Sequence, residues 1–279
     1  MKRLVAIRGA GELATASAIY LHWAGFRVLL LETKEPTSTR REVSFADAVH
    51  DGKKSVARVT CHLADSVKNA EKRLKAGEVV MLIDKDCKCL ETLKPKVLVD
   101  GIIAHENHGT KKGMADFTIA LGPGFCAGRD VDAVVEIMRG HYLGQVIYEG
   151  YSYRDQGKLS LVDAGGAVGN IIYAEESGTF KGYLNISDKV KKGDLLGVIA
   201  AADGHDIEVK SEADGVIRGI ARSGVWAEKG RKIIEINPTM TREECFTITD
   251  KARCVAGGVL LAVTKFEASR RGKISIEFN

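Results

Sequence analysis

The sequence predicts an α/β fold in which a doubly wound parallel sheet is followed by a smaller all-β module. Strand-like and helix-like stretches alternate up to about residue 150, which is typical of parallel strands joined by crossover helices. From residue 158 onward, short strands punctuated by glycine replace the long helical patterns. These patterns predict a cofactor-binding domain of residues 1–154, a barrel-like domain of residues 155–240 and a helical tail of residues 241–279.

The first strand runs from Arg3 to Arg8 into a glycine turn, and a helix to about Trp23 follows. In a Rossmann-like nucleotide-binding unit, the first glycine permits the tight turn and the second lets the backbone approach a pyrophosphate. A small residue at the next motif position lets the helix pack closely on the strand, and the helix N-terminus offers N–H groups to an anion. We therefore expect the ligand site to include Gly9, Ala10, Gly11, Glu12, Leu13 and Ala14. The alternative is that these residues serve only helix-on-sheet packing.

Charged residues follow the predicted strands at the edge where α/β sheets bind ligands. Glu32 ends the second strand about 20 residues beyond the glycines, where a carboxylate can bind ribose hydroxyls. Arg40 and Arg41 come shortly afterwards and could pair a phosphate in a forked geometry. Asp100 lies near the end of a later strand. The alternatives are a solvated glutamate, a solvated basic pair and a turn-capping aspartate.

The alternation continues through the rest of the first domain. A second glycine turn at Gly122 and Gly124 follows a buried strand and is expected either to close the pocket from the other side or to be a simple turn. Strands are predicted at 55–61, 79–84, 97–103, 117–121 and 146–148, and helices at 43–49, 63–75, 89–93 and 129–142.

Composition limits the possible partners and location. The net charge of +4 and the aromatic content of 6% provide no basic stripe with interleaved aromatics, so nucleic-acid binding is not expected. Neither a signal peptide nor a membrane span is expected, which predicts a cytoplasmic protein whose six cysteines are reduced. Cys87-Lys-Cys89 and His105-Glu-Asn-His108 lack the spacing of a zinc site, so no metal is expected.

The second domain contains an internal repeat. Residues 178–199 align without gaps on residues 215–236, and their glycines superpose. Two such halves resemble the barrel-sandwich fold of biotinyl and lipoyl carrier domains, whose modifiable lysine lies on the hairpin between the halves. Here Gly204 occupies the corresponding position. We therefore expect an unmodified barrel-sandwich module used for docking or as a structural partner.

The tail is predicted to be mainly helical. Thr249 or Asp250 is suited to cap a helix that extends to about Val263 and is broken near Gly257-Gly258. A closing strand at 273–278 is possible from the pattern.

Four segments together resemble the YqeB family, relatives of the xanthine dehydrogenase accessory (XdhC/CoxI) proteins. They are Arg8-Gly-Ala-Gly-Glu-Leu-Ala-Thr15, Arg40-Arg-Glu-Val-Ser-Phe-Ala-Asp-Ala-Val49, Leu121-Gly-Pro-Gly-Phe-Cys-Ala-Gly128 and Glu136-Ile-Met-Arg-Gly-His141. The resemblance implies maturation of a selenium-dependent molybdenum hydroxylase, with a molybdopterin-type cofactor or nucleotide bound and the hydroxylase as client. Cys126 and His105 depart from the family pattern.

Two other functions compete with this accessory function. The glycine turn and Glu32 would also suit an NAD(P)-dependent oxidoreductase, although the sequence offers no obvious proton donor for hydride transfer. A purely structural adaptor would leave the pocket empty. A homo-oligomer is possible in each case.

Overall fold

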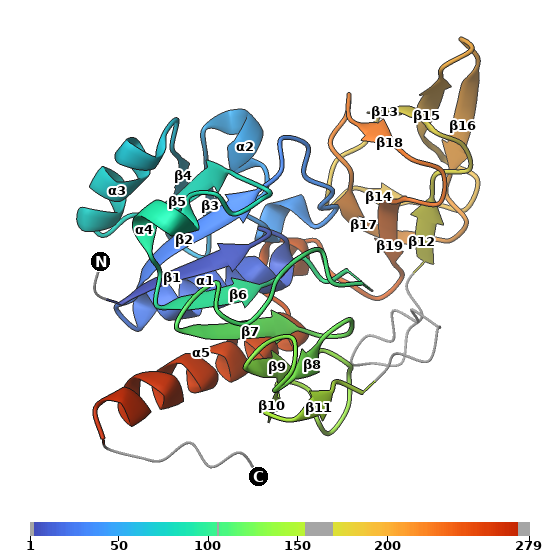
Figure 1. The fold of residues 1–279 in the computed structure, drawn as a ribbon. Coiled ribbons are helices and arrows are strands. Elements are labelled where there is room, and N and C mark those ends of the chain that lie inside the picture. The colour runs from blue at the N-terminus through green and yellow to red at the C-terminus, as the bar shows by residue number, and fades with distance from the viewer. Residues whose placement is uncertain (1–2, 105, 154–169, 273–279) are drawn as a thin grey trace. The chain divides into compact units, whose positions relative to one another are not determined.

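The computed structural model describes residues 3–104, 106–153 and 170–272 (Figure 1). The chain divides into two compact units. Unit 1 comprises Met1–Pro36, Ser44–Gln156 and Ile248–Asn279, and unit 2 comprises Thr37–Val43 and Gly157–Thr247. Residues 37–43 therefore interrupt unit 1 and belong to unit 2.

Unit 1 is built on a nine-stranded sheet. Its strands are β1 (Leu4–Arg8), β2 (Arg27–Glu32), β3 (Lys53–Val56), β4 (Val59–Leu63), β5 (Val79–Ile83), β6 (Val97–Asp100), β7 (Phe117–Leu121), β9 (Ala133–Val135) and β10 (Val146–Ile147). They lie in the order β10-β9-β7-β6-β1-β2-β5-β4-β3. The strands from β9 to β4 are parallel to their neighbours, whereas β10 and β3 pair antiparallel at the two ends.

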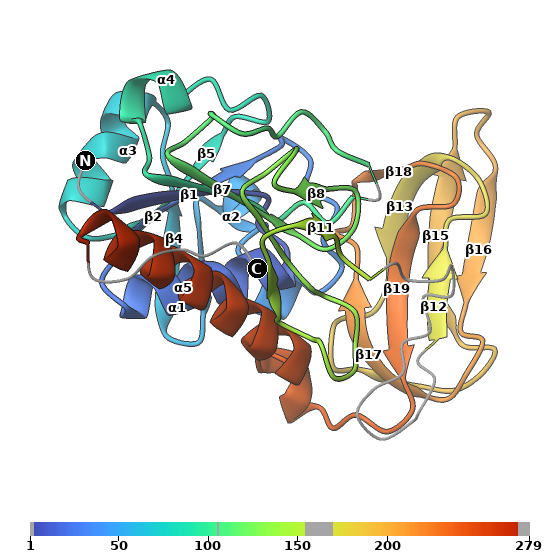
Figure 2. The same ribbon diagram turned by 60° about the horizontal axis from the view of Figure 1, so that its bottom comes forward.

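Helices cover both faces of this sheet (Figure 2). On one face, α1 (Glu12–Trp23) packs on β1 and β2, and α5 (Asp250–Arg270) packs on α1 and on β7, β9 and β10. Val5, Ile7 and Val28 belong to the core on this face. On the other face, α3 (Val67–Lys75) and α4 (Leu90–Leu93) cover Leu4, Ala6 and their neighbours. Burial on both faces explains why β1 is apolar at nearly every position. A short helix, α2 (Ala48–Asp51), precedes β3.

The prediction of a doubly wound, Rossmann-like parallel sheet is wrong, because the sheet is mixed. The helix predicted at 129–142 does not form, and this segment contains β9. The strand predicted at 55–61 is instead the hairpin of β3 and β4, which turns at Ala57 and Arg58 with positive φ angles. The chain therefore reaches β7 and β9 without the long crossover helices that a doubly wound sheet requires. Beside the sheet, β8 (Cys126–Ala127) pairs with β11 (Gly150–Tyr151).

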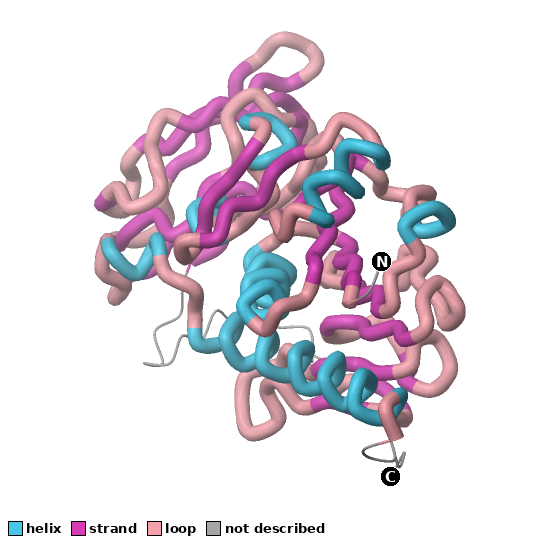
Figure 3. Tube along the Cα trace, turned by 90° about the vertical axis from the view of Figure 1, so that its left-hand side faces the viewer, coloured by secondary structure: helices cyan, strands magenta, loops and turns pink. Residues whose placement is uncertain are grey.

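Unit 2 consists of two four-stranded antiparallel sheets, visible as the strand-rich part of Figure 3. The first has the order β12-β19-β17-β14 and the second β16-β15-β13-β18. Their bounds are β12 (Asn170–Tyr173), β13 (Gly178–Gly182), β14 (Lys189–Val190), β15 (Leu195–Ala201), β16 (Asp206–Lys210), β17 (Gly215–Ile220), β18 (Trp226–Ala227) and β19 (Lys232–Asn237). Two 3-10 helices, η1 (Arg41–Val43) and η2 (Glu243–Phe246), complete unit 2.

The two halves of the sequence repeat have equivalent pairings. In the first half β13 pairs with β15, and in the second half β17 pairs with β19. The short middle strand of each half pairs with the first strand of the other half, β18 with β13 and β14 with β17. The predicted barrel-sandwich class is nevertheless corrected, because the described strands form two separate antiparallel sheets around the core of Phe180, Ile217 and Ile234.

The tail forms one continuous helix and packs in unit 1, so the predicted break near Gly257-Gly258 is wrong (Figure 3). Thr249 caps α5, because its hydroxyl accepts a hydrogen bond from Ala252 N at 3.2 Å. Gly258 lets neighbouring backbone approach, since an added Cβ would lie 2.2 Å from Gly144 O. The strand predicted at 273–278 lies outside the described residues.

Among the described residues, no helix has the length and apolar character required to cross a membrane.

Candidate functional site

The carboxyl edge of the central parallel strands is the candidate site. The strands β2 and β5 extend the sheet on one side of β1. The chain then returns, and β6 pairs with β1 on its other side. In open α/β sheets, ligands bind at such a reversal, outside the carboxyl ends of the two strands. Here the loops that leave β1 and β6 begin at Gly9 and Gly101.

The glycines at this edge have different structural roles. Gly9 has φ +87°, and a Cβ there would lie 3.1 Å from Gly101 O. A Cβ on Gly101 would lie 2.9 Å from the Ala14 Cβ. These residues bring the two loops and α1 into close contact.

Gly11 is a half-buried glycine of the turn. A Cβ on Gly11 would meet no atom within 4 Å, so the space above this residue is open. Gly11 is also the N-cap of α1, and no side chain caps the helix there. The first N–H groups of a helix have no partner within the helix, so a ligand oxygen bound beside Gly11 can accept hydrogen bonds from them. Ala10 and Ala14 have no exposed surface and Leu13 is 8% exposed, so a ligand contact by these three residues stays a prediction.

Two protein side chains hold the peptide groups of Ala10. Its N–H donates to Glu32 Oε2 at 2.7 Å, and its carbonyl accepts the Ser44 hydroxyl at 2.6 Å. The Thr15 hydroxyl also donates to this carbonyl, at 3.0 Å. Burial raises the pKa of Glu32 above its usual range, although hydrogen bonds from Thr33 N and Ala10 N oppose the shift. Glu32 thus contacts the turn directly, and its binding of ribose hydroxyls stays a prediction.

A buried charge network holds the strand ends together. Arg8 Nη1 lies 3.3 Å from Asp100 Oδ2 and donates to Thr110 Oγ1 at 2.6 Å. The Thr110 hydroxyl donates to Asp100 Oδ2, and Ile102 N donates to Asp100 Oδ1. Arg8 also donates to the carbonyl of Lys85, which follows β5. Both Asp100 oxygens therefore have protein partners, and a ligand contact by Asp100 stays a prediction.

Arg40 and Arg41 lie in unit 2, whereas the glycine turn lies in unit 1. Arg41 Nε donates to Ile220 O at 2.9 Å, and Arg40 is 5% exposed. Neighbouring Thr39 donates to Glu235 Oε1. Burial alone would raise the pKa of Glu235. The positive charges of Lys232, Arg40 and Arg218 have the larger effect and lower this pKa to about 2. The ligand site that we propose does not include Arg40 or Arg41.

The second glycine turn leaves the same edge of the sheet, after β7. Gly122 and Gly124 have φ angles of +78° and +91°, respectively. A Cβ on Gly122 would lie 2.4 Å from Ile137 Cδ1, so close packing requires this glycine. Closure of a ligand pocket by this turn stays a prediction.

Apolar side chains remain exposed at the same edge. Ile83 at the end of β5 is 42% exposed, and Ile102 after β6 is 40% exposed. Ile103 is 36% exposed and has φ +60°, which is strained for a β-branched residue. These isoleucines provide apolar surface at the carboxyl edge of the sheet, from which the glycine turn also leaves.

The cysteines of the described residues are unpaired thiols. Burial raises the pKa of Cys87 to about 11 and that of Cys61 above its usual range. Thiols of this kind are poor nucleophiles. In the described part of the chain, no group of three or more His, Cys, Asp or Glu side chains is placed to hold a metal ion.

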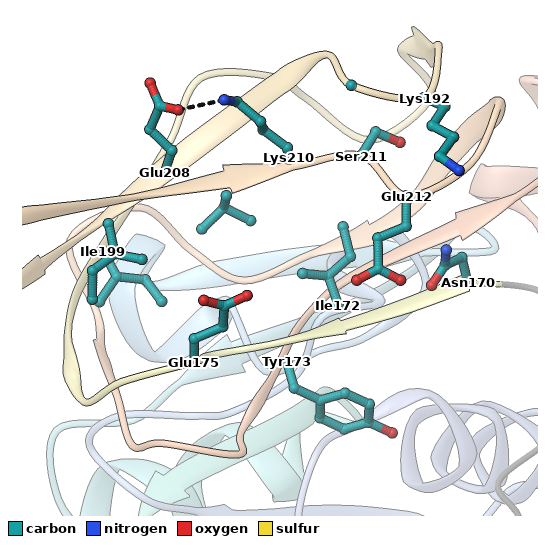
Figure 4. A pocket seen from close by; sticks show the side chains of 13 residues that line it. Asn170, Ile172, Tyr173, Glu175, Lys192, Ile199, Glu208, Lys210, Ser211 and Glu212 are labelled. Carbon is teal, nitrogen blue, oxygen red and sulfur yellow. Dashed lines mark ion pairs between the residues drawn. The ribbon is translucent and has the colours of Figure 1, made fainter.

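Unit 2 contains a separate cleft of about 600 Å³. It opens between β12 and β16, with Ile172 and Ile199 among its apolar lining residues (Figure 4). Glu175 and Glu212 also line it, and Glu208 pairs with Lys210 beside it. No side chain of this cleft belongs to the predicted site.

Sequence reasoning missed Arg8, Ser44, Thr15 and Thr110 as parts of the site. A charged residue at the last position of a buried strand was the available signal for Arg8, because such a group requires a buried partner. Ser44 carried no signal, since its contact with Ala10 joins positions 34 apart in the sequence.

No family model matches the chain. The chain is 40% identical over 261 residues to "Uncharacterized protein YqeB" of Escherichia coli (strain K12), with 94% of this chain and 47% of that protein covered. The chain therefore spans about half the length of the curated relative that it matches. This homology supports the predicted resemblance to YqeB.

Similar solved structures have low scores. They include a succinylglutamate desuccinylase/aspartoacylase from Rhodobacter sphaeroides (TM-score 0.23, 18% identity, 31% of this chain and 30% of that chain). An aspartoacylase family protein from Mesorhizobium loti has a TM-score of 0.26 and 11% identity, with 85% of each chain covered. The ectoine utilization protein EutE (DoeB) from Ruegeria pomeroyi, in its product-bound form, has a TM-score of 0.24 and 12% identity, with 86% of this chain and 59% of that chain covered.

These names correct the predicted function. None of these three structures is named as a molybdenum hydroxylase accessory protein, and the names are those of a desuccinylase, an aspartoacylase and an ectoine utilization protein. The predicted maturation of a selenium-dependent molybdenum hydroxylase is therefore set aside. The TM-scores are too low to assign the neighbours' activities to this chain.

Proposed function

We propose that the chain binds the phosphate groups of a nucleotide-class ligand at the N-terminus of α1. The observation that carries this proposal is the combination at Gly11 of an uncapped helix N-terminus and open space above the backbone. A phosphate there would accept backbone N–H groups and be stabilised by the helix dipole.

Two further features support a nucleotide over a free phosphate. The exposed Ile83, Ile102 and Ile103 provide apolar surface on which a flat heterocyclic base can be buried. Glu32 lies at the end of β2 with one edge of its carboxylate directed to the turn, close to where a ribose would follow the phosphates. NAD(P) and a molybdopterin-type cofactor both carry such phosphates, and both remain untested candidates. A relation to the XdhC/CoxI proteins stays a prediction.

Calorimetric titration with NAD, NADP, ATP and CTP tests the proposal. We expect at least one of them to bind, and we expect Gly11→Val to weaken that binding at least about tenfold, equal to about 1.4 kcal/mol. A Cβ at this position would meet no protein atom within 4 Å. The variant's melting temperature should therefore stay close to that of the wild type.

Gly257→Val is the matched control, because Gly257 also has no atom within 4 Å of an added Cβ and lies on α5. It should leave ligand affinity unchanged. Absence of binding by all four nucleotides, or equal affinities of Gly11→Val and the wild type, would contradict the proposal.

A further inference from the structure

Residues 37–43, here called the strap, connect the glycine turn of unit 1 to unit 2. The chain leaves unit 1 after Pro36 and returns to it at Ser44. Glu32 lies shortly before the strap and Ser44 directly follows it, and both bind Ala10. Ala10 therefore forms hydrogen bonds to the chain on both sides of the strap. Its N–H donates to Glu32 before the strap, and its carbonyl accepts from Ser44 after it.

The strap is bound within unit 2 by specific contacts. Ile220 N donates to Thr39 O at 2.9 Å, and Arg41 Nε donates to Ile220 O at 2.9 Å. Thr39 Oγ1 donates to the buried carboxylate of Glu235 at 2.5 Å. Gly219 lets the strap approach closely, because a Cβ there would lie 3.1 Å from Thr39 O and the strap would have to shift to admit it. The strap is thus fixed to β17 and β19.

Hydrogen bonds also hold the residues of unit 1 that directly follow the strap. Thr15 Oγ1 donates to Ala10 O and accepts a hydrogen bond from Phe45 N at 2.9 Å. Thr15, Ser44 and Phe45 have no exposed surface. A displacement of the strap would therefore act on hydrogen bonds at the first turn of α1, where the proposed ligand binds.

We propose that the strap couples the glycine turn to unit 2, so that unit 2 regulates ligand binding. This inference rests on the proposed function and adds regulation of the same site. Coupling between two sites is reciprocal for binding free energies. Loosening the strap in unit 2 must therefore loosen the glycine turn, and a ligand on the turn must tighten the strap.

Hydrogen exchange of the full chain without ligand tests the coupling directly. Thr39→Val removes the hydrogen bond to the charged carboxylate of Glu235, which fixes the strap to β19. We expect amide exchange at residues 10–16 to rise at least about threefold, together with exchange at residues 216–221.

Val209→Ala is the matched control, because it removes buried side-chain volume from β16 in the core of unit 2. Val209 pairs with Gly197 in the sheet and not with a strap residue. It should raise exchange within unit 2 and leave residues 10–16 unchanged. The proposal is overturned if Thr39→Val leaves residues 10–16 unchanged, or if Val209→Ala affects them equally.

The ligand arm uses the nucleotide that binds best in the titration, at a saturating concentration. Coupling predicts at least about threefold slower exchange at residues 216–221, and unchanged exchange there would overturn reciprocity. If none of the four nucleotides binds, the proposed function fails, while the result of the ligand-free variants still decides whether the strap couples the two units.

Discussion

At the scale of single residues, the buried pair of Arg8 and Asp100 determines how the candidate edge is built. Arg8 is 7% exposed and Asp100 is 2% exposed, so neither charge is solvated by bulk water. The guanidinium joins the end of β1 to the carboxylate at the end of β6 and to the Lys85 carbonyl. The loops that follow these strands are consequently fixed before any ligand arrives.

Asp100→Asn should destabilise unit 1 by about 3 kcal/mol, because it leaves a buried guanidinium without its counter-charge. Urea unfolding followed by circular dichroism measures this loss. Asp116→Asn is the control, because Asp116 forms exposed ion pairs with Lys96 and Arg270 and should contribute less than about 1 kcal/mol. Equal losses in the two variants would contradict a structural function for the Asp100 charge.

The sequence allowed some of these residues to be predicted and not others. Gly9, Gly11 and Ala14 were predictable, because their functions depend on backbone geometry within one turn. The location of Arg40 was not, because the strap's contacts with unit 2 join positions far apart, such as Thr39 and Glu235, which are 196 residues apart. The local sequence shows that Arg40 follows β2, but it contains no information about the unit in which Arg40 packs.

At the scale of elements, α5 shows how two adjacent glycines differ. Gly257 has no atom within 4 Å of an added Cβ, whereas a Cβ on Gly258 would lie 2.2 Å from Gly144 O and 2.8 Å from Val135 Cγ1. Gly258 therefore permits the helix to approach the backbone near β9. The glycine pair does not break the helix, because both residues adopt helical geometry within a 21-residue element.

Gly257→Ala should stabilise the protein by up to about 1 kcal/mol, since alanine has the higher helix propensity. Gly258→Ala should destabilise it by about 1–3 kcal/mol, because backbone must move to admit the methyl group. Thermal unfolding of the two variants provides the comparison. A stabilising Gly258→Ala would show that α5 does not pack as described.

The error at residues 129–142 has a physical cause. Val131, Val134 and Val135 fit a helical face, but a short valine-rich run fits a buried strand equally well. Long-range hydrogen bonds favour the strand. Asp132 Oδ2 accepts from Thr118 N, and Glu136 Oε2 accepts from Tyr153 N. No pattern within the segment indicates these partners.

At the scale of the whole molecule, the two units have separate hydrophobic cores. Unit 1 buries side chains on both faces of its large sheet, and unit 2 buries a different set around Phe180. Each core is large enough to unfold as its own cooperative step. The chain offers a reporter for each unit, because its two tryptophans are Trp23 in unit 1 and Trp226 in unit 2.

Unit 2 should lose stability in acid through Glu235. Its pKa is about 2 in the folded protein against an ordinary value of 4.5, because the nearby positive charges outweigh the effect of burial. A carboxyl group with a lowered pKa stabilises the folded state above its ordinary pKa and loses that contribution as the pH falls. The loss should begin near pH 4.5, be complete near pH 2 and amount to about 3 kcal/mol.

Urea unfolding of Trp23→Phe, in which Trp226 is the remaining tryptophan, should show this loss between pH 5 and pH 2. Adding Glu235→Gln should lower the stability of unit 2 at pH 7, because the buried arginines lose a negative partner, and should flatten its dependence on pH below 4.5. The reciprocal Trp226→Phe protein reports unit 1, which lacks Glu235, and the stability of unit 1 should change less with Glu235→Gln than that of unit 2 does. If the double variant kept the full acid dependence, the stability of unit 2 would have to depend on other carboxylates.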